Sequence, residues 1–274
     1  MGIEIQASRY DHIKAKDIFK KNGFIIVRKL LDYRLIEDCN HTLKAGMDKV
    51  VGDHTIDLCG SLMRAFNTSE TSYRSYLRTF AKSLKVQSLF LQNEVQLIIN
   101  DLGVIEPSTP TTPVTHVMSE NLVCNGIEKV ATVSHQDWPS IQGSIDSVVV
   151  WIPLTSITSD SYPIQVIPGS HSDGLRECKI SEKVSVIDLT PEDEARYIDV
   201  ICEPGDVVIF STFLIHRTKI TSDTLRIAVS NRFDNMLEKS FIERSFPCAY
   251  VRIVDRQIVN PPDNERIKTT LNEI

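Results

Sequence analysis

The stretch Ala-Thr-Val-Ser-His-Gln-Asp-Trp-Pro-Ser at residues 131–140, followed by Ser-Val-Val-Val-Trp-Ile-Pro-Leu at 147–154, organises the whole chain. His135 and Asp137 are two residues apart in a segment with the pattern of a β-strand or the end of one. Side chains at positions i and i+2 of a strand point to the same face, so an imidazole and a carboxylate converge there. This ligand pair suits a divalent transition metal such as Fe(II) better than a calcium cage or a thiolate zinc site. Alone the pair is a weak signal, and it needs the context of the remaining chain.

The composition favours a water-soluble enzyme or binding protein and excludes several other classes. The chain has 274 residues, 42% of them hydrophobic, and a formal net charge of −6. No basic stripe is present, which argues against binding to nucleic acid. The 6 cysteines are scattered without a C-x-x-C pair, as expected of free thiols in a reducing compartment. The sequence shows neither a secretory signal nor an apolar run of membrane-spanning length, so we expect a cytoplasmic protein with no membrane partner.

The first third of the chain has mainly helical periodicity. We expect a helix, a buried strand, a second helix, a long polar loop and then two helices with a break near residues 83–87; the corresponding ranges are 8–22, 23–28, 35–51, 52–72 and 73–102.

Beyond Gly103–Pro113, helix signals give way to short β-runs separated by Gly, Pro, Asp or Ser. These predicted strands are 114–123, 129–137, 145–154, 162–168, 184–189, 198–202, 205–210 and 225–233. Short strands at this spacing predict a β-sandwich or small barrel such as a jelly roll. We therefore expect a single domain over 1–274, with a mostly helical support region (1–105), a β core (106–235) and a peripheral C-terminal tail (236–274).

A second constellation follows the strand that begins at Gly205-Asp206. His216 lies at the far end of that strand, and Arg226 follows in Leu-Arg-Ile-Ala-Val-Ser-Asn-Arg-Phe (225–233). Alternation places Arg226, Ala228, Ser230 and Arg232 on one face and the apolar residues on the other. A buried guanidinium requires an anion, and its planar fork fits a carboxylate in bidentate fashion. Since the strand offers no acidic residue at a matching position, the partner of Arg226 is expected to be a bound carboxylate or an acidic residue elsewhere.

Taken together, these motifs resemble the phytanoyl-CoA dioxygenase family of Fe(II)/2-oxoglutarate-dependent oxygenases, from Phe19-x-x-x-Gly23-Phe24 to about residue 233. The resemblance rests on His135-x-Asp137, Trp151, Ile167-Pro168-Gly169-Ser170-His171, Gly205-Asp206, His216-x-Thr218 and Arg226. It implies a double-stranded β-helix, which is a jelly roll with cupin-like architecture, and this agrees with the strand pattern.

The resemblance also implies roles for individual residues. His135, Asp137 and His216 would be the catalytic 2-His-1-carboxylate triad that holds Fe(II) and leaves coordination positions for 2-oxoglutarate and O₂. Arg226, helped by Thr218, would bind the distal carboxylate of 2-oxoglutarate, and Trp151 would lie against this cosubstrate. Related halogenases have Gly or Ala in place of the carboxylate ligand, so Asp137 favours hydroxylation over halogenation, while desaturation and epimerisation remain open.

Several further residues are candidates for contact with a substrate. Gln165, His171, Asn121 and Arg232 could face the pocket, although each could equally be ordinary sheet surface, a turn residue or a rim ion pair. His116 and Gln136 could also face the pocket, and ordinary sheet surface is the alternative for them.

The sequence therefore predicts a dioxygenase that hydroxylates an unactivated C–H bond of a small polar metabolite, with release of succinate and CO₂. Sugars, amino-acid derivatives and natural products all fit this description. Two alternatives remain, a non-catalytic jelly-roll binding module and a zinc-dependent hydrolase on the same scaffold. The sequence leaves the oligomeric state open.

Overall fold

The computed structural model is a mixed assembly of helices and strands, and it describes residues 2–120, 122, 132–180, 185–221, 225–247 and 261–273. Its helices are α1 (His12–Asn22), α2 (Tyr33–Val51), α3 (Leu58–Thr68), α4 (Glu70–Ala81), α5 (Leu84–Phe90), α6 (Asn93–Asp101), α8 (Trp138–Ile141), α9 (Pro191–Glu194), α10 (Lys239–Glu243) and α12 (Asn264–Glu273), with 3-10 turns η1 (Ala7–Arg9) and η3 (Ser170–Asp173). Its strands are β1 (Glu4–Gln6), β2 (Phe24–Arg28), β3 (Pro107–Ser108), β4 (Val114–Met118), β5 (Val148–Pro153), β6 (Ile164–Val166), β7 (Lys179–Ile180), β8 (Ser185–Val186), β9 (Ile198–Val200), β10 (Val207–Ser211), β11 (His216–Thr218) and β12 (Arg226–Asn235). Among the described residues, no helix combines the length and the apolar character that a membrane crossing requires.

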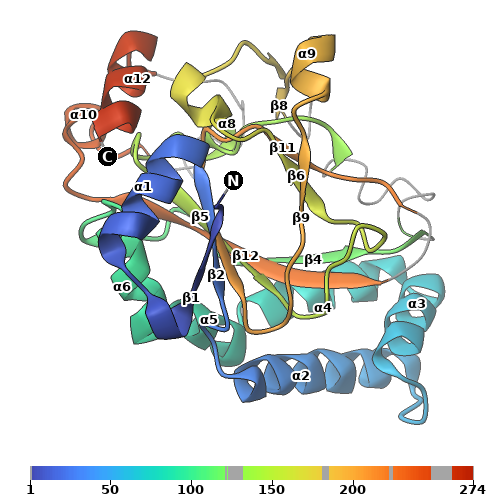
Figure 1. The fold of residues 1–274 in the computed structure, drawn as a ribbon. Helices are drawn as coiled ribbons and strands as arrows, with labels where there is room; N and C mark the ends of the chain where they lie inside the picture. The colour runs from blue at the N-terminus through green and yellow to red at the C-terminus, as the bar shows by residue number, and fades with distance from the viewer. Residues whose placement is uncertain are drawn as a thin grey trace.

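The strands form one large and one small sheet that face each other, with an additional β7–β8 hairpin. The large sheet has the order β1-β2-β10-β5-β12-β3, and β4 also pairs with β12. The small sheet has the order β11-β6-β9. The large sheet curls in Figure 1, with α2 to α6 below it and the small sheet above it. This arrangement is consistent with the predicted jelly roll.

The strands β2, β5 and β10 of the large sheet are buried on both faces, which explains why they are continuous apolar runs. On β5, Val148, Val150 and Ile152 face the helical layer, whereas Val149 and Trp151 face the small sheet. Strand β10 alternates in the same way, with Val208 and Phe210 on the inner side. The side that faces the small sheet is the interior of the curled fold.

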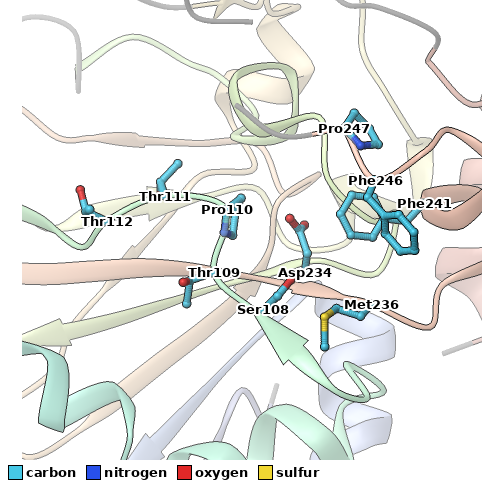
Figure 2. A pocket seen from close by; sticks show the side chains of 10 residues that line it. All are labelled: Ser108, Thr109, Pro110, Thr111, Thr112, Asp234, Met236, Phe241, Phe246 and Pro247. Carbon is cyan, nitrogen blue, oxygen red and sulfur yellow. The ribbon is translucent and has the colours of Figure 1, made fainter. Parts of the chain in front are cut away.

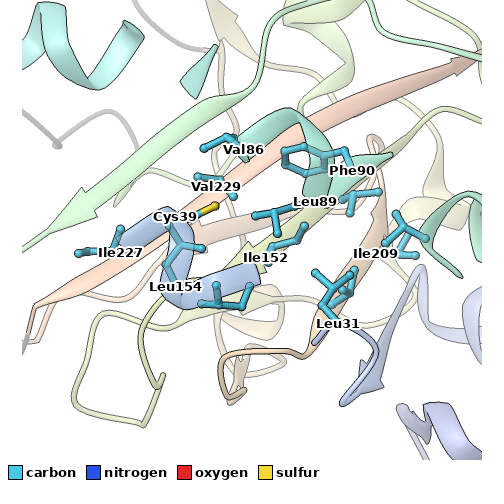
Figure 3. Packing of buried hydrophobic residues seen from close by; sticks show 14 of the residues in the cluster. Leu31, Cys39, Val86, Leu89, Phe90, Ile152, Leu154, Ile209, Ile227 and Val229 are labelled. Atoms are coloured by element: carbon cyan, nitrogen blue, oxygen red, sulfur yellow. The ribbon is translucent and has the colours of Figure 1, made fainter. Parts of the chain in front are cut away.

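The helical layer packs on the outer face of the large sheet. Figure 3 shows Cys39 of α2 and Val86, Leu89 and Phe90 of α5 in one cluster with Ile152, Ile227 and Val229 of the sheet. Most of these helices begin at a capped residue. The side chains of Asp11, Asp32, Asp57, Ser69 and Ser83 each accept a hydrogen bond from a backbone N–H in the first turn of the helix that follows.

Two predictions for the first hundred residues are wrong in detail. Residues 52–72 are not one long loop, because α3 forms there and buries Leu62 and Ala65 against the neighbouring helices. The segment 73–102 holds parts of three helices rather than two, with breaks at Lys82–Ser83 and Leu91–Gln92. Helix α3 contains the weak helix formers Gly60 and Asn67, although Leu58, Leu62 and Phe66 form an apolar stripe along it.

The segment before the metal motif also differs from its predicted strand at 129–137. Residues 123–131 lie outside the described residues. In the described part, His135 forms an isolated antiparallel bridge with His216, and Asp137 already has helical dihedral angles at the N-cap of α8. The pair therefore sits on a turn that follows a single bridge.

Helix α12, in the region that we expected to be a peripheral tail, packs against the fold. Ile267 and Leu271 of α12 are buried with Trp138 and Phe213 in one apolar cluster. Trp138 comes directly after Asp137, and its ring stacks on Phe213 at a centroid distance of 5.3 Å. Helix α12 thus supports the segment that carries the metal motif.

The C-terminal end of α1 is bonded to, and packed against, the turn Pro168-Gly169-Ser170-His171. Gly23 closes α1 in the left-handed region with φ of 77°, and Gly169 N donates a hydrogen bond to Asn22 O. The buried His171 ring lies directly over Gly23, where an added Cβ would come within 2.6 Å of His171 Cγ and 2.9 Å of Leu214 Cδ1. Gly23 is therefore required for its backbone conformation and for the absence of a side chain.

We predict that Gly23→Ala lowers the free energy of unfolding by about 2–4 kcal/mol, through left-handed backbone strain and overpacking. Gly52→Ala is the control, because Gly52 has φ of 74° but no atom near its added Cβ. It should cost only the backbone term of about 1–2 kcal/mol. Urea unfolding measures both variants, and equal losses would contradict the close contact with His171.

Candidate metal centre

Three side chains that the sequence singled out as metal ligands converge in the interior of the fold. One ligand atom each of His135, Asp137 and His216 lies within 4.8 Å of the others, and this is the one such group among the described residues. His135 Nε2 and His216 Nε2 are 3.7 and 4.0 Å from Asp137 Oδ1. Two imidazoles and one carboxylate at these separations form a site for a divalent metal ion such as iron.

The backbone brings the two histidines together. His135 N donates to His216 O and His216 N donates to His135 O, both at 3.0 Å. On the side of β11 away from this bridge, β11 pairs with β6, with His216 opposite Val166. The position of His135 thus depends directly on the small sheet.

Hydrogen bonds to the backbone also fix the orientation of both imidazole rings. His135 Nδ1 is 2.8 Å from Val133 O, and His216 Nδ1 is 3.0 Å from Leu214 O. A carbonyl oxygen can only accept, so Nδ1 is the protonated nitrogen of each ring. The lone pair of each Nε2 therefore points to the shared site, as in metal-binding histidines generally.

Asp137 is held from its other side by Arg232. Arg232 Nε and one terminal nitrogen donate to Asp137 Oδ2 at 3.2 and 2.9 Å. Burial alone would raise the pKa of the Asp137 carboxyl, but Arg232 and the two histidines hold that pKa well below its ordinary value. Asp137 is thus ionised, with Oδ2 engaged and Oδ1 directed toward the histidines.

His216 lies in an apolar environment that keeps its ring neutral. Burial, together with the neighbouring His135, lowers the pKa of His216 to about 4. Phe210 packs against the ring at a centroid distance of 4.9 Å. A neutral imidazole next to an ionised carboxylate is the protonation state that metal binding needs.

Arg226 lies on the same face of β12 as Arg232, as the alternation predicted. It is buried, with its guanidinium donating to Tyr162 O at 2.6 Å and Thr218 Oγ1 at 3.3 Å. Its guanidinium carbon is 5.8 Å from the centroid of the Trp151 ring. The structure therefore brings Arg226, Thr218 and Trp151 together, as the resemblance implied.

Between the two arginines, Ser230 links β12 to β4. Ser230 Oγ accepts from Arg232 at 3.0 Å and is 2.8 Å from His116 Nε2. Desolvation and the positive charges of both arginines lower the pKa of His116 to about 3. His116 is thus a neutral partner in the network that positions Arg232.

Some candidate residues are placed elsewhere. Gln165 pairs across the small sheet with Arg217 and Asp199, and its side chain bonds to both on the face opposite His216. His171 is buried under α1, where burial lowers its pKa to about 4. Neither residue is therefore brought to the metal group, and both are better explained as structural. Asn121 lies outside the described residues.

Gln136 is also structural. Its amide nitrogen donates to Gly174 O and Phe213 O, and its amide oxygen accepts from Arg176 N.

The sequence did not reveal the ion pair between Arg232 and Asp137. Alternation indicated the correct face for Arg232, but the partner depends on how the turn at Asp137 folds over β12. Nor did it single out Asp234, which follows Arg232 on the same face and accepts a hydrogen bond from Ser144 N at 3.0 Å. The signal that could have found Asp234 is its position in the strand, because it is an acidic residue two positions beyond Arg232 on the same inward-facing row.

Comparison with known structures identifies several similar folds. The non-heme α-ketoglutarate-dependent carbocyclase SnoK from nogalamycin biosynthesis aligns with a TM-score of 0.55 and 15% identity, covering 89% of this chain and 94% of SnoK. The epimerase SnoN in complex with Fe³⁺, α-ketoglutarate and nogalamycin RO has a TM-score of 0.55 and 13% identity, with 82% and 83% covered. EctD from S. alaskensis with 2-oxoglutarate and 5-hydroxyectoine has a TM-score of 0.53 and 14% identity, with 82% and 76% covered. At these identities, the similarity shows a shared fold.

Sequence comparison gives the family directly. No curated protein sequence matches the chain significantly. The model of one protein family, described as phytanoyl-CoA dioxygenase (PhyH), matches residues 19–228 and so includes the metal group and Arg226. The chain belongs to the phytanoyl-CoA dioxygenase family of Fe(II)/2-oxoglutarate-dependent oxygenases.

Proposed function

We propose that this protein is an Fe(II)/2-oxoglutarate-dependent dioxygenase that hydroxylates an unactivated C–H bond of a small metabolite, with release of succinate and CO₂. One observation carries the proposal. The ligand atoms of His135, Asp137 and His216 converge within 4.8 Å, while the opposite atom of each side chain is already bonded to the protein. Three protein ligands held in this way would leave further coordination positions on iron for small ligands.

Bound iron would supply the oxidative chemistry, activating O₂ at the expense of 2-oxoglutarate. The two histidines and Asp137 would hold the metal, and the interior apolar residues around them, including Phe210 and Trp151, would exclude water from the reacting centre. The presence of Asp137 supports hydroxylation over halogenation.

Arg226 is the proposed binding residue for the distal carboxylate of 2-oxoglutarate. Its guanidinium is fully charged and buried, and its described contacts are to a carbonyl, a hydroxyl and an aromatic face. The planar fork of a buried guanidinium suits the terminal carboxylate of 2-oxoglutarate in bidentate fashion. Thr218 is close enough to contact the same carboxylate, and Trp151 would form one wall of the cosubstrate site.

Arg232 is the proposed positioning residue for Asp137. It holds Oδ2 with two donors and thereby presents Oδ1 alone to the metal. Its other terminal nitrogen donates to Ser230 Oγ, which is in turn 2.8 Å from His116 Nε2. These hydrogen bonds hold the guanidinium in place, which supports a positioning role for Arg232 over the substrate contact that the sequence left possible.

We further propose that the fold is a double-stranded β-helix and that the substrate is a small molecule, such as an amino-acid derivative or a natural product. The similar folds include a carbocyclase, an epimerase and a protein crystallised with 5-hydroxyectoine. Ring closure and epimerisation are therefore alternative outcomes for the same site chemistry.

We predict that metal-free protein, given Fe(II) and then 2-oxoglutarate without oxygen, develops the weak visible charge-transfer band of a chelated 2-oxo acid. Arg226→Ala should raise the 2-oxoglutarate concentration needed for half of this band about 10- to 100-fold, because a hydrogen-bonded charged contact of about 1.5–3 kcal/mol is lost. His216→Ala should abolish the band.

Arg217→Ala is the matched control for Arg226. Arg217 lies on β11 between His216 and Thr218, but its side chain bonds to Gln165 and Glu194 on the outer face. Its removal should leave the band unchanged. A wild-type protein that retains zinc and shows no band would instead favour the hydrolase or the binding module.

We predict that Arg232→Gln weakens metal binding about 10- to 100-fold, as loss of a partner to a metal ligand generally does. Titration of metal-free protein with Mn(II), followed by electron paramagnetic resonance, measures this affinity. Arg232→Lys should recover only part of it, because one ammonium group cannot replace the two-donor contact with Oδ2. Unchanged or tighter binding in Arg232→Gln would mean that Arg232 only neutralises the metal-free carboxylate.

A further inference from the structure

A pocket of about 680 Å³ lies at the C-terminal end of β12, outside the metal group. Its walls come from the segment after β3, from the end of β12 and from α10 with the residues that follow it (Figure 2). The lining residues are Ser108, Thr109, Pro110, Thr111, Thr112, Asp234, Met236, Phe241, Phe246 and Pro247. This volume is in the range of pockets that bind small molecules.

The lining of the pocket combines apolar, hydroxyl-bearing and acidic side chains. Half of the lining residues are apolar, most of the others carry hydroxyl groups, and the only charged type among these ten is Asp234. No lining residue in the described part of the chain is Lys, Arg or His. A site for a phosphate or a carboxylate ligand would need such a donor. The walls therefore favour a neutral or cationic ligand over an anionic one.

The aromatic part of the wall suits a ring. Phe241 and Phe246 pack edge to face with their centroids 5.3 Å apart. Phe246 is 51% exposed and Met236 is 41% exposed, although both are large apolar side chains. Exposed apolar groups that gather around one pocket are typical of a ligand-binding surface.

Asp234 places one acidic group against this apolar wall. It is only 1% exposed, and its carboxyl occupies the space that Gly143 leaves by having no side chain. Figure 2 shows the carboxyl between Pro110 and Phe246. Burial raises the pKa of Asp234 to about 7, and the nearby Asp146 adds to this effect while Arg244 opposes it. A ligand that donates a hydrogen bond or carries a positive charge would stabilise the ionised form.

The position of Asp234 relates the pocket to the metal group. Asp234 is two residues beyond Arg232 on β12, and alternation puts both on the same face of the strand. Alternate residues in a strand are separated by roughly 7 Å, and Arg232 bonds directly to Asp137. Asp234, which lines the pocket, is thus the next residue on the same face of β12 after Arg232, and Arg232 holds the metal ligand Asp137.

We propose that this pocket is the substrate site of the enzyme and that it takes a ring-bearing molecule whose amine or other hydrogen-bond donor meets Asp234. The inference rests on the proposed function and narrows it, because it selects against acyl thioesters and other polyanionic substrates. The ring would pack on Phe241 and Phe246.

The first test uses matched probes that share a ring and differ in charge, tryptamine with indole-3-propionate and phenethylamine with 3-phenylpropionate. Ligand-observed NMR measures their binding to metal-free protein. Each amine should bind at least about tenfold more tightly than its carboxylate, as a charged hydrogen bond of about 1.5–3 kcal/mol implies. Asp234→Asn should remove this preference, and Phe246→Ala should weaken both members of each pair.

Leu84→Ala is the control variant, because Leu84 is an 83% exposed apolar residue that does not line the pocket. It should bind every probe as the wild type does. Absence of binding by all probes, equal binding of amine and carboxylate, or insensitivity to both pocket variants would overturn the proposal.

A second measurement tests proximity to the metal group. Mn(II), which accepts the same nitrogen and oxygen ligands as Fe(II), should broaden the proton signals of a bound amine probe in the wild type and not in His216→Ala. An amine that binds without broadening while Mn(II) occupies the triad would show that the pocket is not the substrate site. If the charge preference persists but neither Mn(II) binding nor the 2-oxoglutarate band is found, the oxygenase function fails and the pocket stands as a ligand site.

Discussion

The reciprocal backbone hydrogen bonds between His135 and His216 are the constraint on which the site depends. They join the turn that carries Asp137 to the strand that carries Thr218, and β6 and β9 hold that strand in place. Backbone bonds are directional, so a single bridge fixes the distance between the two imidazoles and the direction in which they point. The carbonyl groups of Val133 and Leu214 then orient the rings. Metal ligands that come from distant parts of the chain are thereby positioned by main-chain geometry before any metal is bound.

Burial of charge is the second organising feature. The interior row on β12 contains two arginines, and each has a different task. Arg232 pairs with Asp137 and stabilises its ionised form, while hydrogen bonds to Tyr162 O and Thr218 Oγ1 orient the guanidinium of Arg226 inside the fold. Burying such groups is costly unless each has a defined partner. The same strand ends in Asp234, so one row of alternate residues runs from the proposed cosubstrate site, past the metal group, to the proposed substrate pocket.

Structural contacts account for several residues whose roles the sequence left open. His171 and Gly169 fasten the C-terminal end of α1, and Gly23 makes room for the His171 ring. Gln136, between the two metal-motif residues, bonds to backbone groups of Gly174, Phe213 and Arg176 and so ties the turn to its neighbours. Helix α12 buries Ile267 and Leu271 beside Trp138. These contacts hold the metal-binding turn from several sides, although none of them touches the ligand atoms.

The sequence by itself determined the family, the three metal-ligand candidates and the face of β12 that carries Arg226, because spacing and alternation are local properties of the chain. It also indicated the strands of the β core, since runs that are buried on both faces are continuously apolar. It failed on α3, where weak helix formers such as Gly60 and Asn67 interrupt the pattern, and on the C-terminal helix, whose buried residues are few. Only the tertiary structure decided that Arg232 pairs with Asp137, that Gln165 faces outward and that Asp234 lines a pocket. Each of these outcomes depends on which residues meet once the chain is folded. Sequence spacing carries no information about partners that are distant along the chain.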